Sequence, residues 1–182
     1  MFKPGRRCML CSLFGECKTR PVIGCIGRVL LLYRCMNDDE FVQQFESCAF
    51  PFDQWHHRAH VKLAYIYLVR LGSDGASRKL REGIRAYNAA NKIPDEPARG
   101  YHETLTMFWL RIIEMTLQEY GRRATADEFF DFHPQLSQKK IHRLFYSADL
   151  FTTARAKSEF VEPDLASLPK ARGVAADRGS HP

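Results

Sequence analysis

Residues 55–71 read WHHRAHVKLAYIYLVRL. The apolar side chains of this stretch recur at steps of three and four residues, which is the spacing of one face of an α-helix. The spacing predicts a helix over 52–71 that Gly72-Ser73-Asp74-Gly75 ends. The residues on its buried face are expected to be Trp55, Ala59, Leu63, Ile66 and Tyr67.

The same helical spacing continues through the rest of the chain. The motif Thr125-Ala-Asp-Glu128 has the capping-box pattern that starts a helix, and 163–169 is expected to form an extended strap. We therefore predict an all-α, single-domain helical bundle of about six helices over 37–169, followed by a disordered tail over 170–182. The further helices are expected over 38–48, 75–91, 101–120 and about 125–132, with a last segment from about 137.

The positive charge of the chain is confined to its beginning. The chain has 182 residues and a net charge of +6. Residues 1–36 contain seven basic side chains and one acid, and the other 146 residues contain 20 of each. A neutral body argues against nucleic acid as a partner. The apolar run 22–33 is shorter than the roughly 20 residues of a membrane span, so no span is predicted.

The leader 1–36 is open to four interpretations. Its cysteines could bind zinc, or the leader could be a secretory signal or an organelle transit peptide. It could also lie outside the native fold, because Asn37 followed by three acids is a good helix start after Met36. The body 37–182 holds one cysteine, Cys48, which favours a cytoplasmic location. The candidate zinc ligands are Cys8, Cys11, Cys17 and Cys25.

Two histidine motifs open two of the predicted helices. His57 and His60 are three residues apart and share a helix face, while His56 and His60 form the alternative pair four residues apart. His102 lies at the start of the helix predicted over 101–120. If the helices pack up, down and up, the first and third are parallel, and their first turns are neighbours.

The motifs suggest a metal centre at that end of the bundle. A helix N-terminus disfavours a positively charged imidazole, and metals bind the neutral form. We predict that His57, His60 and His102 bind one divalent zinc, iron or manganese ion. Glu103 or Glu82 could add a ligand or act as a general base, and Tyr101 could move protons.

Other histidines are expected to be structural. His133 precedes a proline, and His142 lies in the basic run 139–143. Both are predicted to lie at the surface, and the basic run is expected to be a solvated face. Gly83 is expected to permit a close approach between helices.

Four motifs in one order resemble a family of small, mostly bacterial, uncharacterised helical proteins. They are His57-Arg58-Ala59-His60, Gly100-Tyr101-His102-Glu103-Thr104, Tyr146-Ser147 and Pro163-Asp164-Leu165. The similarity covers about 38–169. It implies a natural start near Met36 and a characteristic site at the histidines and Glu103, although many members have an acid where Ala59 stands. No activity follows from the resemblance.

Two functions are compatible with these observations. The first is a metal-dependent hydrolase or oxidoreductase acting on a small molecule, in which the metal polarises water or substrate. The alternative is a metal-free helical module that binds a ligand or a protein and has structural histidines. A chelator should lower thermal stability only in the first case.

Overall fold

Five of the six α-helices in the described residues begin where a side chain caps the first turn. The computed structural model describes residues 36–168, so the predictions for the leader, its cysteines and the tail lie outside the described residues. The Asn37 side chain accepts a hydrogen bond from the Glu40 N–H at 2.8 Å, and Glu40 accepts one from the Asn37 N–H at 3.1 Å. Thr125 caps its helix through the N–H of Glu128 at 3.1 Å. Both predicted helix starts are confirmed.

The part of the chain covered by the structure is all-α. It contains six α-helices and three short 3₁₀ helices, with no strand, which confirms the predicted fold class. The described residues from Asn37 onward belong to one compact unit. Between His133 and residue 168 the chain forms only short helices rather than one long segment. In order the elements are α2 (Asp38–Glu46), η1 (Phe52–Gln54), α3 (His57–Ala90), α4 (Glu103–Tyr120), α5 (Ala126–Phe132), η2 (Pro134–Ser137), η3 (Ile141–Leu144), α6 (Ala148–Phe151) and α7 (Ala154–Ser158).

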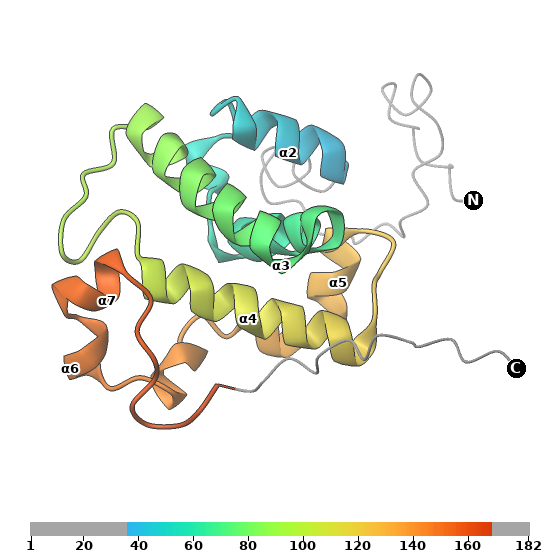
Figure 1. Cartoon of the computed structure of the whole chain (residues 1–182). Coiled ribbons are helices and arrows are strands. Elements are labelled where there is room, and N and C mark those ends of the chain that lie inside the picture. Colours follow the sequence, from blue (N-terminus) through green and yellow to red (C-terminus); the bar gives the residue numbers. More distant parts are fainter. Residues whose placement is uncertain (1–35, 169–182) are drawn as a thin grey trace, which may run out of the picture. The chain divides into compact units, whose positions relative to one another are not determined.

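Helix α3 consists of two parts joined at Gly72. This glycine has φ 68° and ψ −177°, which is not helical, and the two parts of α3 run in different directions (Figure 1). The break falls where the sequence predicted a helix end. The positive φ favours glycine, which has no Cβ. The start differs from the prediction, because 52–54 form a 3₁₀ turn and α3 begins at His57.

The core forms where α3 packs on its neighbours. Its most extensive contact is with α4, while α2 and α5 also pack against it, and α7 packs on α4 (Figure 1). Aromatic rings fill the space beside α2: Phe45 stacks on Trp55 at 4.8 Å and on Tyr87 at 5.4 Å between ring centroids. Trp55 and Tyr67 are both buried, as predicted.

Gly83 of α3 lies directly against the ring of Phe45 from α2. A Cβ added to Gly83 would lie 2.7 Å from the ring of Phe45, which is itself buried. The predicted close approach is therefore confirmed. The ring cannot retreat easily, because the rings of Trp55 and Tyr87 both pack against it.

We expect Gly83→Ala to destabilise the protein by roughly 1–3 kcal/mol, because overpacking outweighs the better helix propensity of alanine. Urea denaturation measures the change. Phe45→Leu shortens the side chain that the new Cβ would meet. Gly83→Ala should therefore cost less stability in a Phe45→Leu protein than in the unsubstituted protein. A stabilised Gly83→Ala protein would contradict the close packing.

The C-terminal strap is held by two of the sequence motifs. The Tyr146 hydroxyl donates to the carbonyl of Val161 at 3.1 Å. Asp164 accepts from the backbone N–H of Ser147 at 2.8 Å and from its hydroxyl at 2.5 Å. Both bonds lower the pKa of the Asp164 carboxyl. These contacts give Tyr-Ser and Pro-Asp-Leu a shared structural role in docking the strap.

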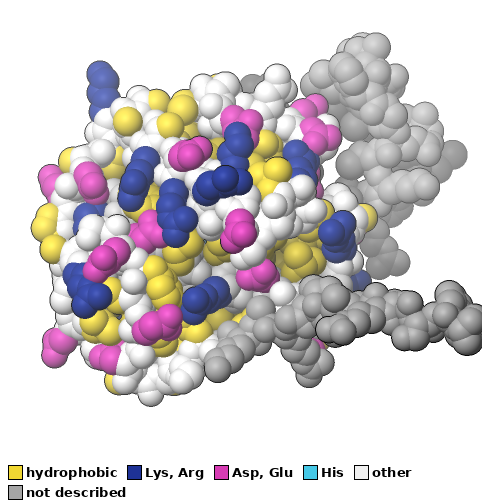
Figure 2. All heavy atoms as spheres, in the orientation of Figure 1, with side chains coloured by type: hydrophobic (Ala, Val, Ile, Leu, Met, Phe, Trp, Pro, Cys, Tyr) yellow, Lys and Arg dark blue, Asp and Glu magenta, His cyan; other side chains and the backbone are white. Residues whose placement is uncertain are grey.

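The described surface matches the neutral charge of the body. Basic and acidic side chains are interspersed on the face seen in Figure 2. Among the described residues, no helix is both long and apolar enough to cross a membrane.

Candidate functional site

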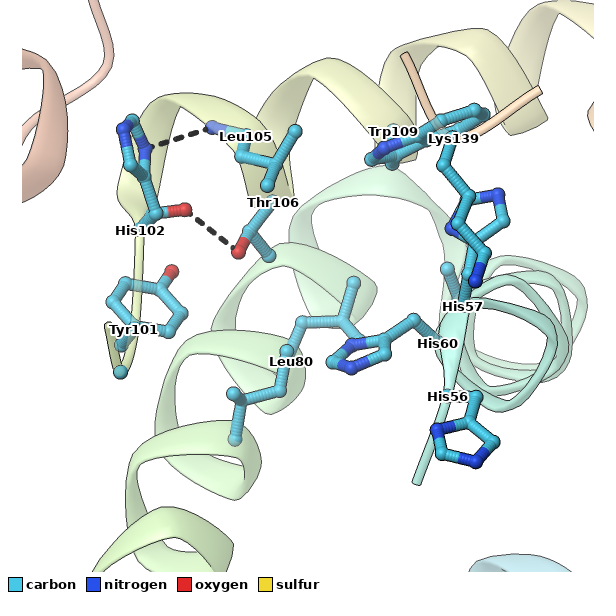
Figure 3. Close-up of a pocket in the computed structure, with 13 residues that line it drawn as sticks. His56, His57, His60, Leu80, Tyr101, His102, Leu105, Thr106, Trp109 and Lys139 are labelled. Carbon is cyan, nitrogen blue, oxygen red and sulfur yellow. Dashed lines mark hydrogen bonds between the residues drawn. The ribbon is translucent and has the colours of Figure 1, made fainter. Parts of the chain in front are cut away.

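A pocket of about 330 Å³ lies between the first turn of α3 and the first half of α4, from His102 to Trp109 (Figure 3). Its walls combine histidines with apolar and aromatic side chains. Both histidine motifs line this pocket, but His57 lies against Trp109, two turns into α4, rather than against His102 as the sequence predicted. The lining residues are His56, His57, His60, Ala64, Leu80, Ile84, Gly100, Tyr101, His102, Leu105, Thr106, Trp109 and Lys139.

His57 has one ring nitrogen committed and one available. Its Nε2 lies 2.7 Å from the carbonyl oxygen of Leu136. A carbonyl only accepts, so Nε2 carries the proton, and Nδ1 of the neutral ring has a lone pair. Nδ1 has no hydrogen-bond partner among residues 36–168. Burial lowers the pKa of His57, the Leu136 carbonyl opposes this shift, and the charge of Lys139 lowers the pKa further.

His60 lies deeper in the same wall. Its ring packs against Trp55 at 4.1 Å between centroids, and neither of its nitrogens has a hydrogen-bond partner within the described chain. Burial lowers the pKa of His60 to about 4, with further lowering from His57 and His56. The ring is therefore neutral at pH 7. The neutral ring has one N–H donor and one nitrogen acceptor that a bound molecule could use.

His102 is the N-cap of α4. Its Nδ1 accepts a hydrogen bond from the Leu105 N–H at 3.2 Å, and its Nε2 lies 3.2 Å from the carbonyl of Phe151. The ring also stacks on Phe151 at 4.5 Å between centroids. Both nitrogens of the neutral ring are thus engaged. Burial lowers the pKa of His102, the Phe151 carbonyl partly offsets this, and Lys157 adds to the lowering.

Glu103 and Tyr101 form a pair beside the pocket. The Tyr101 hydroxyl donates to Glu103 Oε2 at 2.8 Å, and Arg81 Nε donates to Oε1 at 2.7 Å. Tyr101 lines the pocket, whereas Glu103 is buried and does not. Burial raises the pKa of Tyr101, and the bond to Glu103 raises it further. Glu82, the other candidate carboxylate, is exposed and is not in the lining.

The three predicted metal ligands share the pocket without forming a cluster. Figure 3 shows His102 with Tyr101 at one end, and His57 with Lys139 at the other. In the range 36–168, no group of three or more histidine, cysteine, aspartate or glutamate side chains is arranged to hold a metal ion. The geometry therefore suits His102 as a helix cap better than as a ligand, and it leaves His57 and His60 as the chemically available pair.

Sequence reasoning missed two polar members of the site and misplaced one histidine. Lys139 lines the pocket although the basic run was expected to be a simple solvated face. Trp109 lines it as well as contributing to the core, and its indole N–H has no hydrogen-bond partner in the described part of the chain. His133 was predicted at the surface but is buried against Phe129 and Tyr120. The sequence showed only that His133 precedes a proline.

We expect His102→Ala to destabilise the protein by about 1 kcal/mol, because it removes the cap of α4 and the stack on Phe151. His102→Asn retains a side chain that can cap and should recover part of the loss. Thermal and urea denaturation of both variants measure this. Equal stabilities of His102→Ala and the unsubstituted protein would contradict a capping role.

Comparison of the chain with models of protein families, with curated proteins and with solved structures found no match. The functional argument therefore depends on the geometry of the pocket.

Proposed function

We propose that this protein binds a small organic molecule, without a metal ion, in the pocket between the first turn of α3 and the first half of α4. The observation that carries the proposal is the pairing of available imidazole nitrogens on His57 and His60 with an apolar wall. Ligand pockets in proteins are typically concave, largely apolar and furnished with a few polar groups. The volume of about 330 Å³ lies at the lower end of the range for such pockets, roughly 300–1,000 Å³.

His57 is the group best placed for chemistry on a bound molecule. The bond from Nε2 to the Leu136 carbonyl holds the ring and leaves Nδ1 basic. Nδ1 can accept a hydrogen bond from a ligand, or a proton if the ligand is acidic. Glu103 has the weaker claim to a catalytic role, because Arg81 and Tyr101 already occupy both of its oxygens.

Filling the pocket tests the proposal. Leu105 is partly exposed and lines the cavity, so Leu105→Trp should occupy the space that a ligand needs. We expect fragments that bind the unsubstituted protein in an NMR screen to lose at least about tenfold in affinity for Leu105→Trp, since a drug-sized ligand buries most of its surface in its pocket. Leu144→Trp, at an exposed position outside the lining, is the matched control. Fragments that bind elsewhere, or none that bind at all, would contradict the proposal.

A metal-dependent function is the second candidate, and His57 supports it. An imidazole whose other nitrogen donates to a backbone carbonyl is oriented as metal ligands commonly are. With His60 it would supply two ligands for zinc, iron or manganese, and solvent or substrate would complete the coordination. Calorimetric titration of untagged protein with each ion should then show binding that His57→Ala abolishes and His102→Ala retains. The absence of binding in the unsubstituted protein would exclude this candidate.

A further inference from the structure

The charged and polar groups of the pocket define what kind of molecule it suits. Lys139 is the one formally charged residue among the lining residues of the described chain, and none of them is acidic. It is exposed and forms no ion pair with any residue in 36–168. The carboxylate of Glu103, which is buried beside the Tyr101 end of the pocket, forms an ion pair with Arg81 at 2.7 Å. A ligand in this pocket therefore meets one positive charge and no negative one.

Hydrogen-bond donors and an acceptor lie together at the Lys139 end of the pocket. Figure 3 shows Trp109, Lys139 and His57 together, and the rings of His57 and Trp109 are 4.4 Å apart between centroids. The indole N–H of Trp109 and the ammonium of Lys139 are donors. Nδ1 of His57 is an acceptor, because its Nε2 proton is directed to Leu136. An anion without a donor group would accept from the two donors, but it could not form a hydrogen bond with the His57 lone pair.

The other walls of the pocket are apolar. Ala64, Leu80 and Ile84 are buried side chains of α3 that border the cavity, and Leu105 adds an aliphatic surface from α4. At the far end the Tyr101 hydroxyl is already directed to Glu103. Each methylene group that a ligand buries here contributes about 0.8 kcal/mol. The walls thus favour a ligand with a hydrocarbon body.

From these three features we propose that the pocket binds a small hydroxycarboxylate with an apolar body. The inference depends on the proposed binding function and specifies its ligand class. The carboxylate pairs with Lys139 and the Trp109 N–H, and a neighbouring hydroxyl donates to His57 Nδ1. One lysine matches the single charge of a carboxylate, whereas a phosphate monoester, with a charge near −2, would remain partly uncompensated.

Three related probes test each part of the assignment: 3-phenyllactate, 3-phenylpropionate and 3-phenylpropanamide. They carry respectively a carboxylate with a hydroxyl, a carboxylate alone, and neither group. Calorimetric titration at pH 7.5 should give affinities that decrease in that order, each step by about fivefold, the factor that corresponds to roughly 1 kcal/mol. Lys139→Met should reduce binding of 3-phenylpropionate to the level of the amide. Lys140→Met, an exposed neighbour outside the lining, should leave all three affinities unchanged.

Two results would overturn the inference. Equal binding of the amide and the carboxylate would remove the role of Lys139, and equal binding of phenyllactate and phenylpropionate would remove the role of His57. In both cases the pocket still binds molecules, so the proposed function would stand. If none of the three probes binds, the ligand class is wrong, and the fragment screen with Leu105→Trp decides separately whether the pocket binds any small molecule.

Discussion

Asp127→Ala should destabilise the protein by about 3 kcal/mol or more. Lys62 is a lysine with only 1% of its side chain exposed, and its Nζ lies 2.8 Å from Asp127 and 3.3 Å from Asp38. Asp127 also accepts from Arg58 Nε at 2.9 Å and Nη2 at 2.8 Å. Removing one partner of a buried charge typically costs about 3–5 kcal/mol, and here Lys62 loses its shorter ion pair while it keeps the longer one to Asp38.

Two variants separate this buried network from ordinary surface charge. Asp131 binds the same arginine at 2.7 Å but has a side chain that is 56% exposed, so Asp131→Ala should cost at most about 1 kcal/mol. Lys62→Met should cost less than Asp127→Ala, because Asp127 keeps Arg58 and Asp38 keeps the Ala126 N–H at 2.9 Å. Urea denaturation at pH 7 provides the comparison. Equal losses for Asp127→Ala and Asp131→Ala would show that the network contributes no more than surface pairs.

Acidification should weaken the fold strongly through His60. Burial lowers its pKa from 6.5 to about 4 in the folded state, so the unfolded chain binds more protons between these values. The contribution of the neutral His60 ring to the free energy of unfolding is fully present above pH 6.5 and is lost as the pH falls toward 4. A difference of this size corresponds to roughly 3 kcal/mol. The lowered pKa values of His57, His102, His133 and His142 act in the same direction.

Denaturation curves from pH 7.5 to 4 test this contribution. His60→Gln removes the titrating group and should reduce the loss of stability over that range by roughly 3 kcal/mol relative to the unsubstituted protein. His56→Gln changes the exposed neighbour, which has the smallest of the three effects on the His60 pKa, and is the matched control. An unchanged pH dependence in His60→Gln would mean that the imidazole is solvated in the folded state.

Local chemistry predicted much of the fold. The caps at Asn37 and Thr125, the break at Gly72 and the close approach at Gly83 each depend on interactions or conformations that a short stretch of sequence specifies. The burial of Lys62 could not be predicted this way. Its partner Asp127 is 65 positions away, and only the packing of α5 on α3 brings the two together.

The site was predicted in location more than in geometry. Helix periodicity and short connections placed the motifs of His57 and His102 in one pocket. Helical periodicity does not specify the direction in which a ring nitrogen points. A histidine that caps a helix and a histidine that binds a metal therefore look the same in the sequence. The partners that decide the difference are the carbonyls of Leu136 and Phe151, which belong to short helices with weak periodicity.

The most direct test of the pocket is long-range ¹H–¹⁵N NMR of the histidine rings during titration with a fragment that binds. Before addition, His57 and His102 should both be neutral with the proton on Nε2, as their carbonyl partners require. Saturation with the fragment should shift the Nδ1 resonance of His57 and leave that of His102 in place. An unmoved His57 resonance in the fully bound protein would contradict a binding role for this pocket.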